Sequence, residues 1–244
     1  MPETKSRGMV FGTEKIRYIL SLPVGEPFQT RRLITPQPVE DQGSGYLLWK
    51  DGMFDIHTYP TDSMLLGHCP YGKPGANLHI RECWQYVDDD GQPIELFDNS
   101  TYAQTALNWR GSELGSVLYK ADLDHCGQCP ANVSTGLFHV TPKDYWQSPR
   151  FMPRWAARTE LEVREVRVQR LLDITNADAE AEGVCLWAET MTAERFEKLH
   201  RAAGLWPLPS PRQSYLVWWD ELNRRRAPSS SNPFVWALVA RRNS

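Results

Sequence analysis

The sequence predicts a single α+β domain, a small mixed β-barrel flanked by helices and carrying two loop-rich insertions. Three observations predict this class. Short strand-like alternations are separated by loops and short helices, the clearest helical patterns come late in the chain, and no Gly-rich phosphate loop or dinucleotide motif occurs. A length of 244 residues suits one core with insertions, so we expect one domain over residues 1–244. The lack of nucleotide motifs excludes the commonest NAD- and ATP-dependent enzymes.

Composition restricts the class of protein further. Hydrophobic residues at 41% and charged residues at 23% match an ordinary globular protein. No apolar run approaches the roughly 20 residues of a membrane span, and the N-terminus lacks the apolar stretch of a secretory signal. We therefore expect no membrane contact and a cytoplasmic location. A net charge of −3 argues against coating of nucleic acid by bulk electrostatics, but residues 146–244 carry a basic excess that allows local arginine patches.

The first part of the chain predicts short elements separated by loops. A helix after the opening strand would turn Ile16 and Ile19 inward, and the next clear strand follows the turn at Pro74-Gly75. The predicted elements are a strand over 8–11, a helix over 13–20, an irregular loop or small hairpin over 35–62, a strand over 78–84, an insertion over 86–116 and a strand over 117–122.

The most regular pattern begins at Arg158. Its apolar positions change parity midway, which predicts two strand pieces joined by a bulge at Arg164-Glu165. These apolar positions are Leu161, Val163, Val166, Val168 and Leu171. Thr175 and Asp178 form a capping-box pattern that opens a short helix, and Gly183 ends it.

The chain then predicts two further helices and a buried terminal strand. One helix ends near Gly204, a third covers 214–225, and the strand covers 234–239. The run Arg224-Arg225-Arg226 closes the third helix, where cations interact favourably with the carbonyl end of the helix dipole. As a nucleic-acid contact, this run would need to lie on the same side as Arg154 and Arg158.

Five short segments, taken in order, carry a family resemblance. They are the opening strand and helix with Thr30-Arg31-Arg32, the segment Cys69 to Gly75 leading to Ile80-Arg81-Glu82, the segment Tyr119 to Asp122, Met152 to Arg158, and Asn232 to Trp236. Together they resemble prophage-encoded ASCH-domain proteins, relatives of the PUA fold. The match runs from about residue 8 to the C-terminus and is interrupted by 86–116 and 184–212, which we expect to be insertions.

The resemblance implies an ASCH/PUA-like barrel whose concave side receives a nucleic acid or a modified nucleoside. We therefore expect a binding module of phage or prophage origin that recognises RNA, single-stranded DNA or a modified nucleoside in an arginine-lined cleft. Arginine forks suit phosphate, and an indole can stack on a base. The expected ligand contacts are Thr30, Arg31, Arg32, Arg81, Lys120, Arg154, Trp155 and Arg158. The competing interpretations are a solvated polar loop at 30–32 and a core anchor at Trp155.

An enzyme is the first alternative. Some small ASCH proteins are amidohydrolases that act on N4-acetylcytidine with a lysine, a threonine and a glutamate. Thr30 matches the threonine, but Pro27 stands at the lysine position and offers neither an amine nor a backbone donor. If the protein is an enzyme, we expect Thr30 and Glu82 to be catalytic, with Lys120 replacing the lysine. A further alternative is an interaction protein of phage assembly or host takeover that uses the insertions.

The cysteines leave a metal site open. No cofactor is required for binding, and five cysteines without a secretory signal suggest reduced thiols. Cys126-x-x-Cys129, with His125 adjacent and Cys69 elsewhere, could instead complete a tetrahedral structural zinc site. The other interpretation is a pair of reduced thiols in a loop.

Overall fold

The computed structural model describes residues 7–41, 43, 45–50, 52–55, 63–87, 116–122, 146–205 and 209–243. The strands are β1 (Arg7–Val10), β2 (Pro27–Leu33), β3 (Val39–Glu40), β4 (Tyr46–Trp49), β5 (Gly52–Asp55), β6 (Asn77–Arg81), β7 (Trp84–Val87), β8 (Ser116–Tyr119), β9 (Glu160–Arg170) and β10 (Phe234–Arg242). The α-helices are α1 (Thr13–Ser21), α2 (Ser63–Gly67), α4 (Asn176–Ala181), α5 (Val184–Glu189), α6 (Ala193–Ala202) and α7 (Pro211–Asn223). The 3₁₀ turns are η1 (Lys120–Asp122), η2 (Pro149–Phe151), η3 (Arg154–Ala156), η4 (Leu171–Asp173) and η5 (Ser229–Ser231).

The described elements form a mixed α+β architecture, which confirms that part of the predicted fold class. The strands make a five-stranded sheet in the order β1-β6-β9-β10-β2, a three-stranded sheet β3-β4-β5 and the pair β7-β8. Among the described strands these sheets do not close into a barrel, and the barrel stays a prediction.

The chain divides into two compact units. Unit 1 comprises Met1–Arg7, Ser21–Leu78 and Glu160–Ser244, and unit 2 comprises Gly8–Leu20 and His79–Thr159. Each unit has its own hydrophobic cluster. The expectation of one domain with insertions stays a prediction.

Unit 1 is built on the antiparallel strands β2, β10 and β9, with β10 in the middle. Ala237 of β10 lies opposite Arg31 of β2 on one side and Arg167 of β9 on the other. The register shifts between Val239 and Ala240, which leaves Arg164 as the extra residue of β9. The predicted bulge is thereby confirmed, and it explains why the inward positions of β9 change parity.

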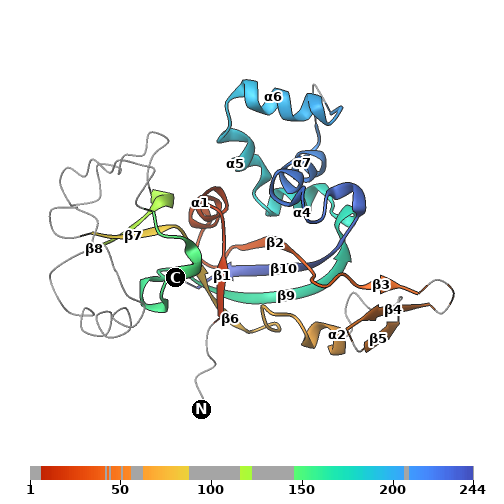
Figure 1. The fold of residues 1–244 in the computed structure, drawn as a ribbon. Helices are drawn as coiled ribbons and strands as arrows, with labels where there is room; N and C mark the ends of the chain where they lie inside the picture. Colours follow the sequence, from red (N-terminus) through yellow and green to blue (C-terminus); the bar gives the residue numbers. More distant parts are fainter. Residues whose placement is uncertain are drawn as a thin grey trace, which may run out of the picture. The chain divides into compact units, whose positions relative to one another are not determined.

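Helices α4 to α7 gather on one side of β2, β9 and β10 (Figure 1). They share a hydrophobic cluster in which Trp187, Tyr215 and Trp219 pack with Val235 of β10. The stretch 184–212, expected as an insertion, supplies α5 and α6, and its Trp187 is part of this cluster. The helical layer is therefore held to the sheet by burial of large aromatic side chains.

The helix boundaries follow local capping signals. The capping box of Thr175 and Asp178 opens α4 as predicted, and Gly183 adopts a left-handed conformation with φ 86° directly after it. Helix α7 begins at Pro211, earlier than the predicted start at 214, because Ser210 and Gln213 form a second capping box. A serine followed by proline and, three residues on, by glutamine is the local signal for this earlier start.

Residues 35–62 contain the three-stranded sheet β3-β4-β5, in agreement with the small hairpin that is one of two predictions for this stretch. Leu47 and Trp49 of β4 are buried, whereas Leu48 points to the exposed face. Alternation along β4 therefore gives this small sheet one buried and one exposed face.

Unit 2 contains helix α1, strand β6 from His79 onward and the pair β7-β8. The strand predicted over 78–84 ends at Arg81 and a new strand starts at Trp84. The strand predicted over 117–122 ends at Tyr119, so the prediction that Lys120 lies in a strand is wrong, because the chain turns there into η1. The core cluster of this unit consists of Trp84, Met152 and Ala156.

Candidate functional site

The predicted ligand-binding residues fall in both units. Unit 1 holds Thr30, Arg31 and Arg32, and unit 2 holds Arg81, Lys120, Arg154, Trp155 and Arg158. In unit 1, Arg31 is held by carboxylates of the protein and Arg32 is half-buried. In unit 2, Arg158 is held by carboxylates, whereas Arg154 is exposed.

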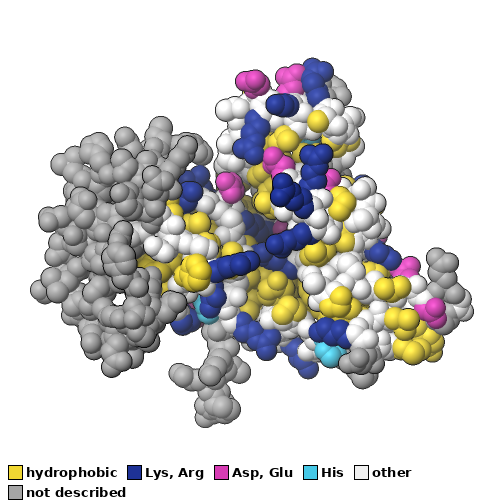
Figure 2. Space-filling view, in the orientation of Figure 1, with side chains coloured by type: hydrophobic (Ala, Val, Ile, Leu, Met, Phe, Trp, Pro, Cys, Tyr) yellow, Lys and Arg dark blue, Asp and Glu magenta, His cyan; other side chains and the backbone are white. Residues whose placement is uncertain are grey.

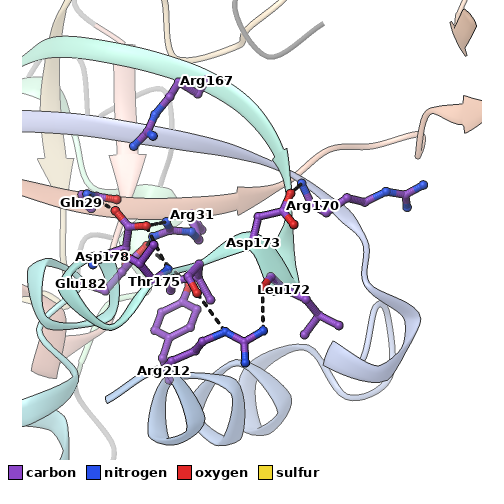
Figure 3. Close-up of polar contacts among 12 residues, drawn as sticks. Gln29, Arg31, Arg167, Arg170, Leu172, Asp173, Thr175, Asp178, Glu182 and Arg212 are labelled. Carbon is purple, nitrogen blue, oxygen red and sulfur yellow. Dashed lines mark hydrogen bonds and ion pairs between the residues drawn. The ribbon is translucent and has the colours of Figure 1, made fainter. Parts of the chain in front are cut away.

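Arg31 lies at the centre of a buried ion-pair network in unit 1 (Figure 3). Its side chain has 0% exposure; Nη1 donates to Glu182 Oε1 at 3.1 Å, and Nη2 lies 3.2 Å from Asp178 Oδ2. The Tyr215 ring centroid lies 5.9 Å from the Arg31 Cζ. Because Asp178 belongs to α4 and Glu182 directly follows that helix, the network ties β2 to the helical layer. Arg31 therefore has a structural role.

Asp178 connects this network to the start of α4. Its Oδ1 accepts a hydrogen bond from Gln29 Nε2 at 2.6 Å, and its Oδ2 accepts one from the Thr175 backbone N–H at 3.1 Å. Burial alone would raise the pKa of Asp178, but the bonds from Thr175 and Gln29 and the charge of Arg31 outweigh it and lower the pKa. Asp178 is therefore kept ionised as a counter-ion for Arg31.

The neighbours of Arg31 are also parts of the sheet. Thr30 is buried on β2, which pairs with β10 along its whole length. Burial lowers the pKa of Arg32, and electrostatic interactions with Tyr71, Glu182 and Tyr215 partly offset this. The stretch 30–32 is therefore paired strand, and the alternative of a solvated polar loop is wrong.

Arg158 forms a second ion-pair network, in unit 2. Its Nε and Nη2 donate to the two carboxylate oxygens of Glu82 at 2.9 and 3.0 Å, and its Nη1 donates to Asp122 Oδ2 at 2.6 Å. The guanidinium lies over the Tyr119 ring, with Cζ 3.9 Å from the centroid. Burial alone would lower the pKa of Arg158, but the bonds to Asp122 and Glu82 outweigh it and raise the pKa. The fork of Arg158 is thus occupied within the protein.

Glu82, the predicted general base, is only 1% exposed. Burial raises the pKa of Glu82, and the hydrogen bonds and charge of Arg158 oppose that rise. Both of its oxygens accept hydrogen bonds from Arg158, so Glu82 belongs to the scaffold that positions Arg158. A catalytic role for Thr30, Glu82 and Lys120 stays a prediction; Thr30 lies in unit 1 and the other two lie in unit 2.

The chain leading to Arg158 forms what we call the turn segment, residues 147–159, which contains η2 and η3. It is anchored at both ends: the Gln147 N–H donates to the Trp84 carbonyl at 2.9 Å, and the Ile80 N–H donates to the Thr159 carbonyl at 3.0 Å. Between these anchors Met152 is 2% exposed and packs into the cluster around Trp84. The turn segment is therefore held in one conformation by main-chain bonds and a buried side chain.

The turn segment exposes an aromatic ring that sequence reasoning missed. Phe151, directly before the buried Met152, is 65% exposed. The Ser148 hydroxyl caps the turn by accepting from the Arg150 N–H at 3.4 Å, and the side chains of Arg150 and Arg154 are exposed. A lone phenylalanine is assigned to the core by default, and the signal that could correct this is the Ser-Pro turn start at 148–149.

Other predicted residues surround the turn segment within unit 2. Trp155 is half-buried and packs edge-to-face on Trp84, with centroids 6.1 Å apart, so it is partly a core anchor. The Tyr119 hydroxyl donates to the Ala156 carbonyl at 2.8 Å, which places the exposed Lys120 one residue from this contact. Among the predicted phosphate contacts of unit 2, Arg154 and Lys120 are the exposed ones.

Arg81 is the last residue of β6, and its side chain passes close to Gly8 of β1. A Cβ added at Gly8 would overlap the Arg81 side chain, so this glycine is what allows the close approach. The buried Nε of Arg81 has no hydrogen-bond partner within the described part of the chain. Arg81 is thus a pre-positioned cation with a donor that the described residues leave unused.

The predicted zinc ligands are described only in part. Burial raises the pKa of the Cys69 thiol to about 11, which disfavours the thiolate that zinc requires. His125, Cys126 and Cys129 lie outside the described residues. Within the described ranges, no three His, Cys, Asp or Glu side chains are grouped as a metal site would need. The zinc site stays a prediction.

The chain matches no protein-family model, no curated protein and no solved structure. The resemblance to ASCH-domain proteins accordingly stays a prediction. In the part of the chain that the structure describes, no helix has the length and apolar character needed to span a bilayer.

Proposed function

We propose that the protein binds single-stranded nucleic acid through the turn segment. Phe151 would stack on a base, and Arg150, Arg154 and Lys120 would contact the neighbouring phosphates. The observation that carries the proposal is the exposed Phe151 ring on a segment anchored at both ends. In sequence, this 65% exposed ring lies between two exposed arginines, a combination suited to a planar anionic ligand.

Stacking explains how a protein of net charge −3 can bind a polyanion. Base–aromatic stacking contributes about 1–3 kcal/mol per base and tolerates any sequence, since every base has a π face. The arginines supply a local positive charge that the overall charge lacks. Because the turn is already ordered, little conformational entropy is lost on binding.

Arg150 and Arg154 are more exposed than Arg158, the third arginine of the turn segment. Arg158 is neutralised by Glu82 and Asp122, whereas Arg150 and Arg154 have exposed side chains. We therefore assign Arg158 to the scaffold that holds the turn segment and assign ligand contact to Arg150 and Arg154.

The test is fluorescence anisotropy with labelled oligo-dT and oligo-U of about ten nucleotides, a length within the site sizes of single-strand binders. We expect Phe151→Ala to weaken binding roughly 10- to 100-fold, the loss of one stacked base. Phe151→Trp should retain affinity, because the ring is kept. Comparison of the two oligonucleotides reports the preference between DNA and RNA.

The matched control is Met53→Ala, which truncates a 63% exposed apolar side chain in unit 1 and should leave binding unchanged. The proposal is wrong if the wild-type protein binds neither oligonucleotide at low salt. It is also wrong if Phe151→Ala binds as tightly as wild type.

A further inference from the structure

Three successive arginines, Arg224, Arg225 and Arg226, follow α7 in unit 1. All three are exposed. Within the described residues, none of their side chains takes part in an ion pair or a hydrogen bond. The run is therefore a concentrated positive charge without a counter-ion from the described chain.

The carboxylates closest along the chain are already used. Asp220 accepts from the Ser229 N–H at 2.6 Å and from the Ser229 hydroxyl at 2.7 Å. Glu221 accepts from Arg195 of α6 at 3.1 Å. Among the described residues, neither carboxylate forms an ion pair with the three arginines.

The backbone that carries the run is held in place. The N–H groups of Arg226 and Ala227 donate to the Asn223 carbonyl at 2.8 and 2.9 Å. The buried Ala227 in turn accepts from Trp219 Nε1 at 2.8 Å. The three side chains thus extend from a fixed turn, which limits the entropy lost when they bind a ligand.

The rest of the helical layer shows a different arrangement. In Figure 2 the Lys and Arg side chains on the visible face of the helices lie beside Asp and Glu side chains. The pairs Arg195–Glu221 and Arg201–Glu197 belong to this layer. Arg195 and Arg201 of α6 are thus each paired with a nearby carboxylate, whereas within the described part of the chain the three arginines after α7 are not.

We infer that Arg224–Arg226 is a second phosphate-binding surface for single-stranded nucleic acid, distinct from the turn segment. The inference rests on the proposed function, since it assigns a further contact to the same ligand. Adjacent arginine forks fit a polymer with a phosphate at every nucleotide, because one strand can satisfy several forks at once. Contacts of this kind carry no sequence information and make binding dependent on salt.

The experiment measures affinity for labelled oligo-dT of about 6 and about 30 nucleotides across a salt series, chosen around the site sizes of single-strand binders. The test variant is Arg225→Ala/Arg226→Ala, which spares Arg224 because that residue closes α7. It should bind the long oligonucleotide roughly tenfold or more weakly than wild type does. Its slope of log K against log salt should become shallower by roughly 0.7 for each phosphate that the variant no longer neutralises.

The control is Arg164→Ala/Arg167→Ala, which removes the same charge from arginines already paired with Glu162 and Glu165. It should leave the long-oligonucleotide affinity close to wild type. An unchanged slope in the test variant, or an equal loss of affinity in the control, overturns this inference and leaves the proposed function standing. A different pair of results would separate the two proposals in the other direction. If Phe151→Ala has no effect, and the test variant no longer binds the long oligonucleotide more tightly than the short one, the proposal that the turn segment binds nucleic acid is wrong and the inference about Arg224–Arg226 holds. If wild type binds neither oligonucleotide, both are overturned.

Discussion

The two ion-pair networks of this protein use the same side-chain types in different surroundings. Each places one arginine between two carboxylates and beside a tyrosine ring, Arg31 in unit 1 and Arg158 in unit 2. The Arg31 side chain has 0% exposure, whereas that of Arg158 has 26% and its partner Asp122 has 35%. The first network joins a strand to a helical layer, and the second joins the turn segment to Glu82, which directly follows β6, and to Asp122 of η1.

The networks also differ in how their carboxylates respond to protons. The pKa of Asp178 is lowered because hydrogen bonds and Arg31 outweigh burial, and the pKa of Glu82 is raised because burial outweighs Arg158. The contribution of an ion pair to stability therefore depends on how burial balances against hydrogen bonds, and the residue types alone do not determine it.

The largest expected effect is that of Arg31→Met. It leaves the buried Glu182 and the partly buried Asp178 without their counter-ion, which should lower the free energy of unfolding by about 3–5 kcal/mol. Urea denaturation followed by tryptophan fluorescence measures this. Arg164→Ala is the control, because its ion pair with Glu162 is solvent-exposed and should contribute little to stability. Equal midpoints for the two variants would contradict a structural role for Arg31.

Arg158→Ala should have a smaller effect. The substitution leaves the buried Glu82 unpaired, but partial solvent access to the site reduces the cost to about 2 kcal/mol. The same urea experiment checks the order of the two variants. If Arg158→Ala destabilised the protein more than Arg31→Met does, the network in unit 2 would contribute more to stability than the network in unit 1, contrary to this expectation.

The opposite pKa shifts predict opposite responses to pH. Since the folded pKa of Glu82 lies above its ordinary value of 4.5, the stability linked to Glu82 is present below that value and is lost as pH rises through the folded pKa. We therefore expect Glu82→Gln to gain stability relative to wild type as pH rises above about 4.5. Urea midpoints measured between about pH 4 and 8 report the trend. If the difference in urea midpoint between Glu82→Gln and wild type does not change with pH, the raised pKa of Glu82 is contradicted.

Asp178 should behave in the reverse way. Its folded pKa lies below the ordinary value of 3.8, so its stabilising contribution is present above that value and is lost as pH falls through the folded pKa. Asp178→Asn should be less stable than wild type at neutral pH, and the deficit should shrink in acid. The same titration, extended to about pH 2, measures it. A deficit that grows on acidification would contradict the assignment.

The smallest expected effect on stability is that of Phe151→Ala. An exposed side chain away from the core should change the free energy of unfolding by no more than about 0.5 kcal/mol. The adjacent Met152→Ala is the internal control, since truncating a buried methionine costs about 2–5 kcal/mol. Both are measured by urea denaturation. A large destabilisation by Phe151→Ala would assign the ring to the core and remove its availability for stacking.

Much of the local structure can be predicted because its signals lie within a few residues of one another. The parity change in the apolar positions of β9 reveals the bulge at Arg164, and the capping box of Thr175 and Asp178 marks the start of α4. The differences between prediction and structure are also local. The strand that ends at Tyr119 is predicted to continue through Lys120, and α7 starts before its predicted first residue.

The candidate site can be predicted only in part. Arg154 is recognisable from its place beside Trp155, but the same pattern includes Arg158, whose fork is taken by Glu82 and Asp122. Phe151 escapes prediction, because a phenylalanine and the methionine after it look alike in sequence, and only packing decides which of them faces the core.

By itself, the sequence determined the α+β class, the parity of β9 and the starts and ends of several helices, because backbone geometry and capping act over a few residues. Tertiary structure alone decided which arginines are occupied. Arg31 meets Glu182 across 151 residues of chain and Arg158 meets Glu82 across 76, and no spacing rule reaches that far. Whether an arginine fork is filled by the protein's own carboxylates depends on which distant segments pack together, and only folding brings those segments into contact.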